Sequence, residues 1–277
     1  MDTLQRKLHS SRIVLLTILF LLAFISAMLF QFIQVPDVFH PEKFSDFSKL
    51  VKRLIMITLF ASAVVAAMCN QLFARLFGIK KVLLLSFLFH LLALIFLTPI
   101  HLGLGTYAES RLFAFVGMFF LGFAVTTILI SLNTYVIIKM PGKVTFGILM
   151  LSVFANIGAF VSPLLFRLFG HFDMEWLFIL FFFLLILGSI FVVARFLCDL
   201  PFPKHLVHLR KGTLIWKELH VRLLLFVFIV LFYTFCENTF NVWGLIYLFN
   251  FFEINPANEF ISMFWFFLII GQIIVVY

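Results

Sequence analysis

Charged side chains are scarce in this sequence of 277 residues. Asp, Glu, Lys and Arg make up 12% of the chain, whereas hydrophobic residues make up 64%, and the mean hydropathy is +1.20. A soluble globular protein needs polar side chains to cover its core. The scarcity therefore excludes a soluble domain, and we expect an integral membrane protein.

The sequence also lacks the short alternating stretches that are typical of a transmembrane β-barrel. Its apolar runs are continuous and long enough for membrane-spanning helices, which need about 20 residues. The runs cover residues 13–34, 54–74, 82–100, 112–138, 146–168, 176–197, 223–249 and 259–277. We therefore predict an all-α polytopic membrane protein with eight spans.

Familiar catalytic and nucleotide-binding motifs are missing as well. The chain contains no G-x-G-x-x-G, P-loop, G-x-S-x-G or H-E-x-x-H pattern, so we expect neither an enzyme nor nucleotide-driven transport. Its three cysteines show no C-x-x-C spacing, and three histidines in a basic loop, at 205, 208 and 220, are irregularly spaced. No metal site and no cofactor are expected.

Basic residues are distributed as membrane topology requires. Most of the 20 Lys and Arg residues fall in four segments, 6–12, 75–81, 139–143 and 195–222, that an alternating topology places on one side. The positive-inside rule makes this side cytoplasmic. We expect an inner (plasma) membrane protein with a cytoplasmic N-terminus, an uncleaved first helix and no nucleic-acid partner.

The long loop after the sixth span divides the chain. We predict a six-helix bundle at 1–197, a basic cytoplasmic linker at 198–222 and a two-helix partial bundle at 223–277. Loops between the first six spans are short, so we expect sequential helices to pack as antiparallel neighbours.

One acidic residue, Glu237, lies well inside a span. Asn241 and Gly244 follow it at i+4 and i+7 on one helical face, and Asn238 lies beside them. A charge at the bilayer centre costs about 2.5 to 3.5 kcal/mol, so this group needs a partner, water or a proton. It either binds solute or couples protons, or it serves as a hydrogen-bonding contact between helices.

Other polar side chains in the spans give weaker signals. Gln31 lies near the outer end of the first span, Asn133 lies in the fourth, and Ser152 and Asn156 share a face of the fifth. His90 in the third span is more typical of a packing histidine than of a proton carrier. Trp243 and Trp265 are candidates for packing or cavity lining.

Several segments resemble the major facilitator superfamily, and more narrowly its fucose-proton symporter family of sugar permeases. The basic loop at 71–82 resembles the superfamily loop after the second helix, and Gly78-Ile79-Lys80 is similar to the symporter family's G-Y-K turn. The segment 133–136 is similar to the family's N-P-[YF]-V motif, except at the proline. Further similar residues are Glu237, Trp243, Tyr247, Leu248, Phe264, Trp265, Gly271 and Gln272.

The resemblance implies two six-helix bundles built from inverted three-helix repeats, with solute held near the midplane and exposed alternately to each side. It implies a proton-coupled secondary transporter of a small polar solute such as a monosaccharide, and a chain truncated after the eighth helix. The resemblance implies that Glu237 and Asn133 line the solute or proton site. From their positions in the spans we add Asn241, Asn238, Trp243 and Gln31 as candidates for the same site. The implied gating loop contains Gly78, Arg75, Lys80 and Lys81, whose cations equally suit a purely topological role.

Three alternatives stay open. The chain is a transporter of another solute, such as an organic acid, an amphiphile or a drug; a truncated non-functional remnant; or a polytopic membrane enzyme or scaffold. The enzyme is the least favoured, because the sequence has no cluster of His, Asp or Glu at one membrane face.

Overall fold

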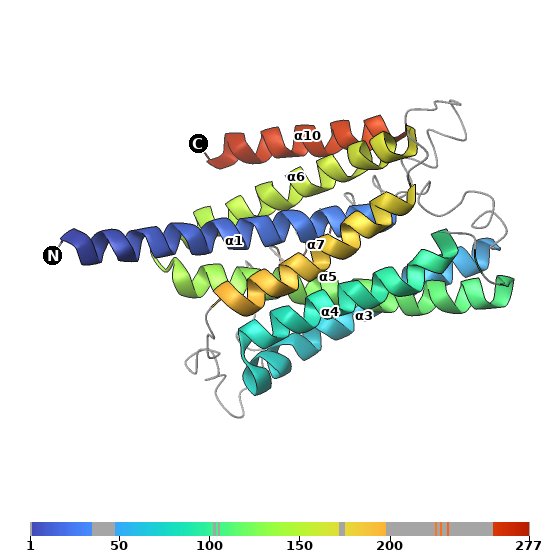
Figure 1. Ribbon diagram of the computed structural model, residues 1–277, viewed down its shortest axis with the longest axis horizontal. Helices are drawn as coiled ribbons and strands as arrows, with labels where there is room; N and C mark the ends of the chain where they lie inside the picture. The colour runs from blue at the N-terminus through green and yellow to red at the C-terminus, as the bar shows by residue number, and fades with distance from the viewer. Residues whose placement is uncertain are drawn as a thin grey trace.

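The computed structural model describes residues 2–34, 48–101, 104, 106–171, 175–197, 225, 228, 232 and 257–276. Within these residues the protein contains helices and no strand. The helices are α1 (Asp2–Gln34), α3 (Lys49–Phe77), α4 (Ile79–His101), α5 (Tyr107–Lys139), α6 (Val144–His171), α7 (Glu175–Phe196) and α10 (Ala257–Val276). Figure 1 shows them as a bundle of long helices that run roughly along the longest axis of the molecule.

Six of these helices, α1 and α3 to α7, are long and apolar enough to cross a membrane. They match the first six predicted spans, and the prediction of a polytopic all-α membrane protein is confirmed. The predicted eighth span coincides with α10, whose apolar part is the shorter stretch Ser262–Ile274. The predicted seventh span lies outside the described residues except at 225, 228 and 232, which are helical.

Local sequence signals fix several helix ends. α5 begins with a capping box, in which the Thr106 side chain accepts from the Glu109 backbone N–H and the Glu109 carboxylate accepts from the Thr106 N–H at 2.7 Å. Between α3 and α4 the whole connection is Gly78, with φ at 83°. Only glycine adopts this conformation without strain, so Gly78 sets the sharp reversal between the two helices.

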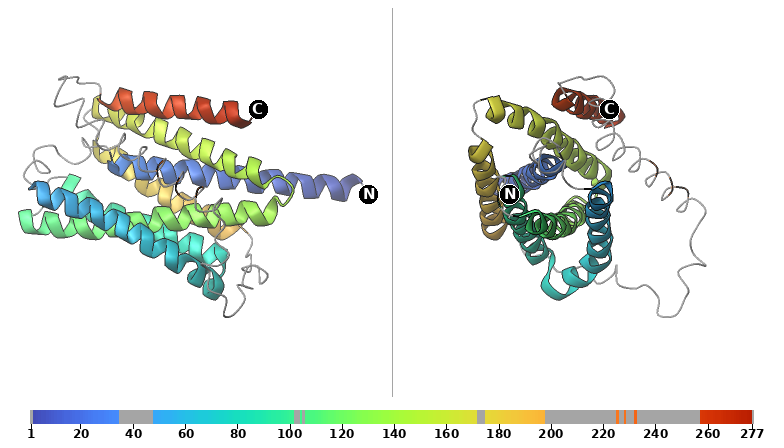
Figure 2. Two further views of the ribbon diagram at one scale, coloured as in Figure 1. Left: turned by 180° about the vertical axis from the view of Figure 1, so that it is seen from behind. Right: turned by 90° about the vertical axis from the view of Figure 1, so that its right-hand side faces the viewer.

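Helix pairing differs in part from the expected order. Among consecutive helices only α4 and α5 pack extensively, as expected for antiparallel neighbours. The other extensive pairs are α1 with α6, α3 with α5, and α6 with α10. Figures 1 and 2 show α6 between α1 and α10, so the fifth span joins the bundle to the eighth.

Two glycines allow the closest helix crossings. A Cβ atom on Gly158 of α6 would overlap the backbone carbonyl of Phe24 in α1, and one on Gly122 of α5 would overlap the carbonyl of Leu59 in α3. Small residues at membrane helix interfaces let two backbones approach and pack closely. These glycines therefore determine how closely α1 packs on α6 and α3 on α5.

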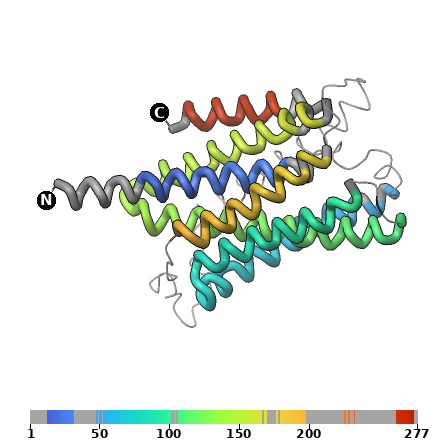
Figure 3. The backbone as a smooth tube through the Cα atoms, viewed as in Figure 1, coloured from blue at the N-terminus to red at the C-terminus, as the bar shows by residue number. Residues whose placement is uncertain are grey.

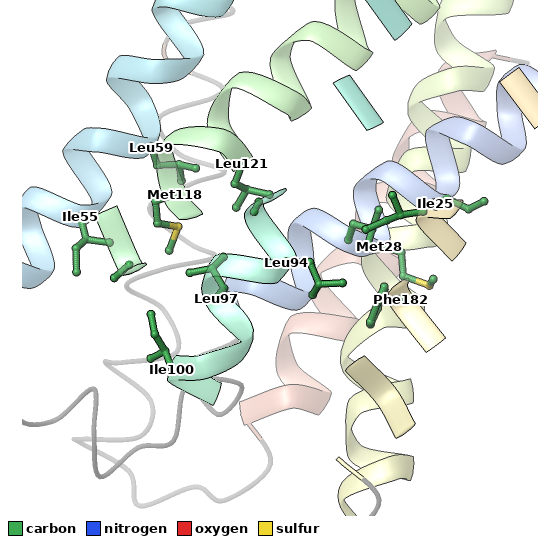
Figure 4. Close-up of a cluster of buried hydrophobic side chains, with 14 of the residues drawn as sticks. Ile25, Met28, Ile55, Leu59, Leu94, Leu97, Ile100, Met118, Leu121 and Phe182 are labelled. Atoms are coloured by element: carbon green, nitrogen blue, oxygen red, sulfur yellow. The ribbon is translucent and has the colours of Figure 1, made fainter. Parts of the chain in front are cut away.

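The buried side chains of the six-helix bundle form two apolar clusters along its length. One joins α1, α3, α4, α5 and α7 around Met28, Leu97, Met118 and Phe182 (Figure 4). The other surrounds Leu22, Phe87, Leu132 and Tyr135 toward the end where α1 begins. Both clusters include buried residues of α1, α3, α4, α5 and α7, whose backbone paths are drawn in Figure 3. The bundle is thus one continuously packed body.

Basic side chains gather at one end of this body. Because consecutive helices reverse direction, the start of α1, the α3–α4 and α5–α6 connections and the end of α7 lie together, at the left of Figure 1. Among cations whose side chains are described, this end carries Arg75, Lys80, Lys81, Lys139, Lys143 and Arg195, and the opposite end carries Arg53 and Arg111.

Candidate functional site

Several buried hydroxyl groups in the bundle bond to their own helix. Ser62, Ser86 and Ser189 each donate to a carbonyl three or four residues earlier, at 2.7 to 2.8 Å. Such bonds satisfy a hydroxyl inside a membrane helix without reaching another element. These serines therefore offer little to a solute.

The contact between α6 and α10 is different, because its side chains bond across helices. Gln272 of α10 accepts from the Asn156 amide at 2.9 Å and donates to the Ser152 hydroxyl, also at 2.9 Å. Asn156 is 8% exposed and lies near the middle of the span Val144–Leu165. The predicted sharing of one α6 face by Ser152 and Asn156 is confirmed, since a single amide bridges them.

Two further polar groups lie on the same face of α10. Ser262 donates to the backbone carbonyl of Phe160 at 3.3 Å. Trp265 is 6% exposed and packs on Ala159, but its indole N–H has no hydrogen-bond partner in the described structure. A buried donor without an acceptor is costly, so it marks a position where a ligand or water would be favourable.

The predicted solute and proton site is only partly within the described residues. Glu237, Asn238, Asn241 and Trp243 lie outside them. Their role stays a prediction, as does the shared helical face proposed for them.

Gln31 and Asn133 are described, and they lie far apart. Gln31 is buried at the last residue of the span Ile13–Gln31, with its side-chain oxygen unpaired in the described structure. Asn133 is half-buried and six residues before the end of α5, at the opposite end of the bundle. The structure does not bring these two side chains into one site.

His90 lies in the bundle interior, as expected for a packing histidine. It is 2% exposed, its Nδ1 is 3.1 Å from the Ser86 carbonyl oxygen, and its ring lies against Phe87. Its Nε2 has no hydrogen-bond partner within the described residues. No group of three His, Cys, Asp or Glu side chains suited to a metal ion occurs in the described part of the chain.

The segment predicted to form the gating loop is a tight turn at Gly78. The Gly78 N–H donates to the Ala74 carbonyl at 3.1 Å, and the Gly78 carbonyl accepts from the Val82 N–H at 3.2 Å. Arg75 and Lys81 are exposed and Lys80 is half-buried. All three cations therefore lie at the basic end of the bundle, within one turn of the reversal.

Gln272 is the residue that sequence reasoning undervalued, since only the resemblance pointed to it. An amide inside the apolar stretch Ser262–Ile274 was the available signal. What it bonds to could not be inferred, because its partners lie more than 100 positions earlier in the chain.

A scan against known protein families, a search of curated proteins and a search of solved structures each found no match to this chain. The resemblance to the major facilitator superfamily therefore rests on the sequence segments alone.

Proposed function

We propose that this protein is a secondary transporter of the major facilitator type that moves a small polar solute across the plasma membrane, coupled to protons, by alternating access. It would bind its solute between the six-helix bundle and the helices that follow the basic linker. A monosaccharide is the solute that the resemblance favours.

The observation that carries this proposal is the pattern of helix pairing. An inverted repeat would make α1, α3 and α4 equivalent to α5, α6 and α7, in that order. The pair α1–α6 is then equivalent to the pair α5–α3. Both pairs are extensive, and both cross at a glycine whose missing side chain admits a backbone carbonyl. Equivalent helices run in opposite directions, as in the inverted repeats of secondary transporters. The exchange does not extend to every pair, because α4–α5 packs extensively and its equivalent α7–α1 does not.

Orientation follows from the basic end. Positive charge is retained on the cytoplasmic side of membrane proteins, so the end with Lys80, Lys143 and Arg195 faces the cytoplasm and α10 runs inward.

We predict opposite labelling of two exposed cations when each is replaced by cysteine in a cysteine-free background. In intact cells a membrane-impermeant maleimide should label Arg111→Cys and not Lys143→Cys, because the two side chains lie at opposite ends of the bundle. Lys143→Cys should react only after permeabilisation. Labelling of Lys143→Cys in intact cells, with Arg111→Cys protected, would reverse the topology.

Transport itself is tested with the purified protein in proteoliposomes. Radiolabelled neutral sugars, polyols, organic acids and hydrophobic cations are offered with and without a pH gradient, against liposomes that contain no protein. Uptake or counterflow of a polar solute is expected, and it should rise with an inward proton gradient. Failure to move any of these solutes would contradict the proposal.

Glu237→Gln should lower proton-driven uptake by about tenfold, because glutamine keeps the size of the side chain and donates and accepts as the protonated acid does, but cannot ionise. The matched control is Glu109→Gln, which alters an exposed carboxylate in a capping box that glutamine also completes. Uptake is measured with and without the pH gradient. Equal rates for both variants under both conditions would remove Glu237 from coupling and from binding.

A further inference from the structure

The α6–α10 seam consists of facing side chains on two apolar helices, all of which except Ala159 carry a polar group. The positions are Ser152, Asn156 and Ala159 on α6, and Ser262, Trp265 and Gln272 on α10. A polar group in lipid destabilises the protein unless it forms a hydrogen bond. Their pairing therefore shows what chemistry the seam can accommodate.

The two carboxamides in the seam satisfy each other in this structure. The Asn156 amide donates to Gln272, and Gln272 donates onward to Ser152. Each carboxamide carries two N–H donors and a carbonyl with two lone pairs. A solute hydroxyl also donates and accepts hydrogen bonds. It can therefore take the place of one carboxamide in this row of hydrogen bonds without leaving its neighbours unpaired.

Further along the seam, a free donor on α10 belongs to a ring that packs on Ala159 of α6, whose carbonyl lacks its helical partner. The Trp265 N–H is unpaired, and the ring packs on Ala159. Because Pro163 lacks an N–H, the Ala159 carbonyl loses the donor that it would have in a regular helix. One hydroxyl group could accept from the indole and donate to this carbonyl, while the ring covers an apolar face of the same molecule.

The charge of the seam is zero. Residues 144–166 and 260–276 contain no Asp, Glu, Lys or Arg. An ionised solute would enter at a cost of about 2.5 to 3.5 kcal/mol per charge on insertion scales, with no counter-charge on either helix. The seam therefore selects against ionised solutes and in favour of neutral ones.

We propose that the α6–α10 seam is the binding site for a neutral, hydroxyl-rich solute of the polyol or monosaccharide class. Asn156 and Gln272 exchange their mutual hydrogen bond for bonds to its hydroxyl groups, and Trp265 supplies a donor and a stacking face. This inference rests on the proposed transport function and names its solute class and site. It places the solute near the middle of the membrane, between the bundle and α10.

The test measures equilibrium binding of tritiated sorbitol and a tritiated hexose to the full chain in phospholipid nanodiscs, free of sugar-based detergents. Gln272→Leu and Asn156→Leu should each weaken binding of the better probe about tenfold, and Trp265→Phe about fivefold, as expected when a neutral ligand can no longer form these hydrogen bonds. Gly271→Ala, beside Gln272 in open space, and Trp176→Phe, at an exposed tryptophan, serve as matched controls and should bind like the wild type.

A purely structural seam gives a different result. Gln272→Leu would then lower the melting temperature without changing the dissociation constant, and Trp265→Phe would leave binding intact, because its N–H makes no bond in the unliganded protein. Gln272→Asn, which keeps the amide but shortens its reach, guards against a variant that fails to fold, and it too should bind more weakly.

The possible outcomes distinguish a failure of the proposed binding site from a failure of the proposed transport function. Wild-type affinity in the three seam variants, with solute uptake in proteoliposomes still present, overturns the site and leaves the transporter standing. A protein that neither binds nor moves any neutral or ionised solute overturns both. Tight binding of an ionised solute that depends on Gln272 overturns the proposed solute class.

Discussion

Alanine in place of Gly158 should lower the free energy of unfolding by about 2 to 3 kcal/mol, the upper part of the range for overpacking a tight interface. The added Cβ would overlap the Phe24 carbonyl of α1, and the Met28 backbone nitrogen lies 3.2 Å from the same position. Backbone atoms cannot move aside as a flexible side chain can. The two helices must therefore separate, and this weakens their van der Waals attraction along the whole crossing.

The same substitution at Gly188 is the control. Gly188 lies in α7 with no atom within 4 Å of an added Cβ, so alanine there should be neutral or slightly stabilising through helix propensity. Unfolding is followed in bilayers by steric trapping, and in detergent by thermal denaturation. Equal stability of Gly158→Ala and Gly188→Ala would mean that α1 and α6 do not cross at this glycine.

Hydropathy predicted the spans because the bilayer requires about 20 apolar residues in a row, whatever those residues contact. It could not predict the helix pairing. In a soluble helix the apolar face indicates the packed side, but in α4 and α7 both the packed and the lipid-facing positions are apolar. Phe87 is fully buried while Leu88 beside it is 44% exposed, and nothing in their residue types distinguishes them. The expectation of sequential neighbours therefore held mainly for α4 and α5.

Only the α6 side of the seam could be predicted from the sequence. Ser152 and Asn156 share a face at i and i+4, which the sequence states directly. Which helix they meet depends on the close approach of α10 to α6, and the bridge through Gln272 needs that approach. Gln31 and Asn133 illustrate the opposite case. They were grouped by residue type, and their places on α1 and α5 put them at opposite ends of the bundle.

Phe182→Ala should cost about 3 kcal/mol of unfolding free energy, at the low end for a buried phenylalanine. Phe182 is fully buried in the apolar cluster of Figure 4, with Ile25, Met28 and Leu94. Phe191→Ala, the same change at a 64% exposed position of the same helix, should stay within about 0.5 kcal/mol of the wild type. Steric trapping in bilayers measures both.

Comparing Phe182→Ala with Phe191→Ala distinguishes the free energy of transfer from lipid from the free energy of close packing. Lipid chains are as apolar as the protein interior, so moving Phe182 from lipid into the bundle gains little hydrophobic free energy. The cost of its removal must come from the dispersion attraction that the atoms lining the new cavity no longer have. A large destabilisation at Phe182 alone would therefore show that close packing stabilises the six-helix bundle. Equal effects at both positions would contradict this, since only Phe182 is packed.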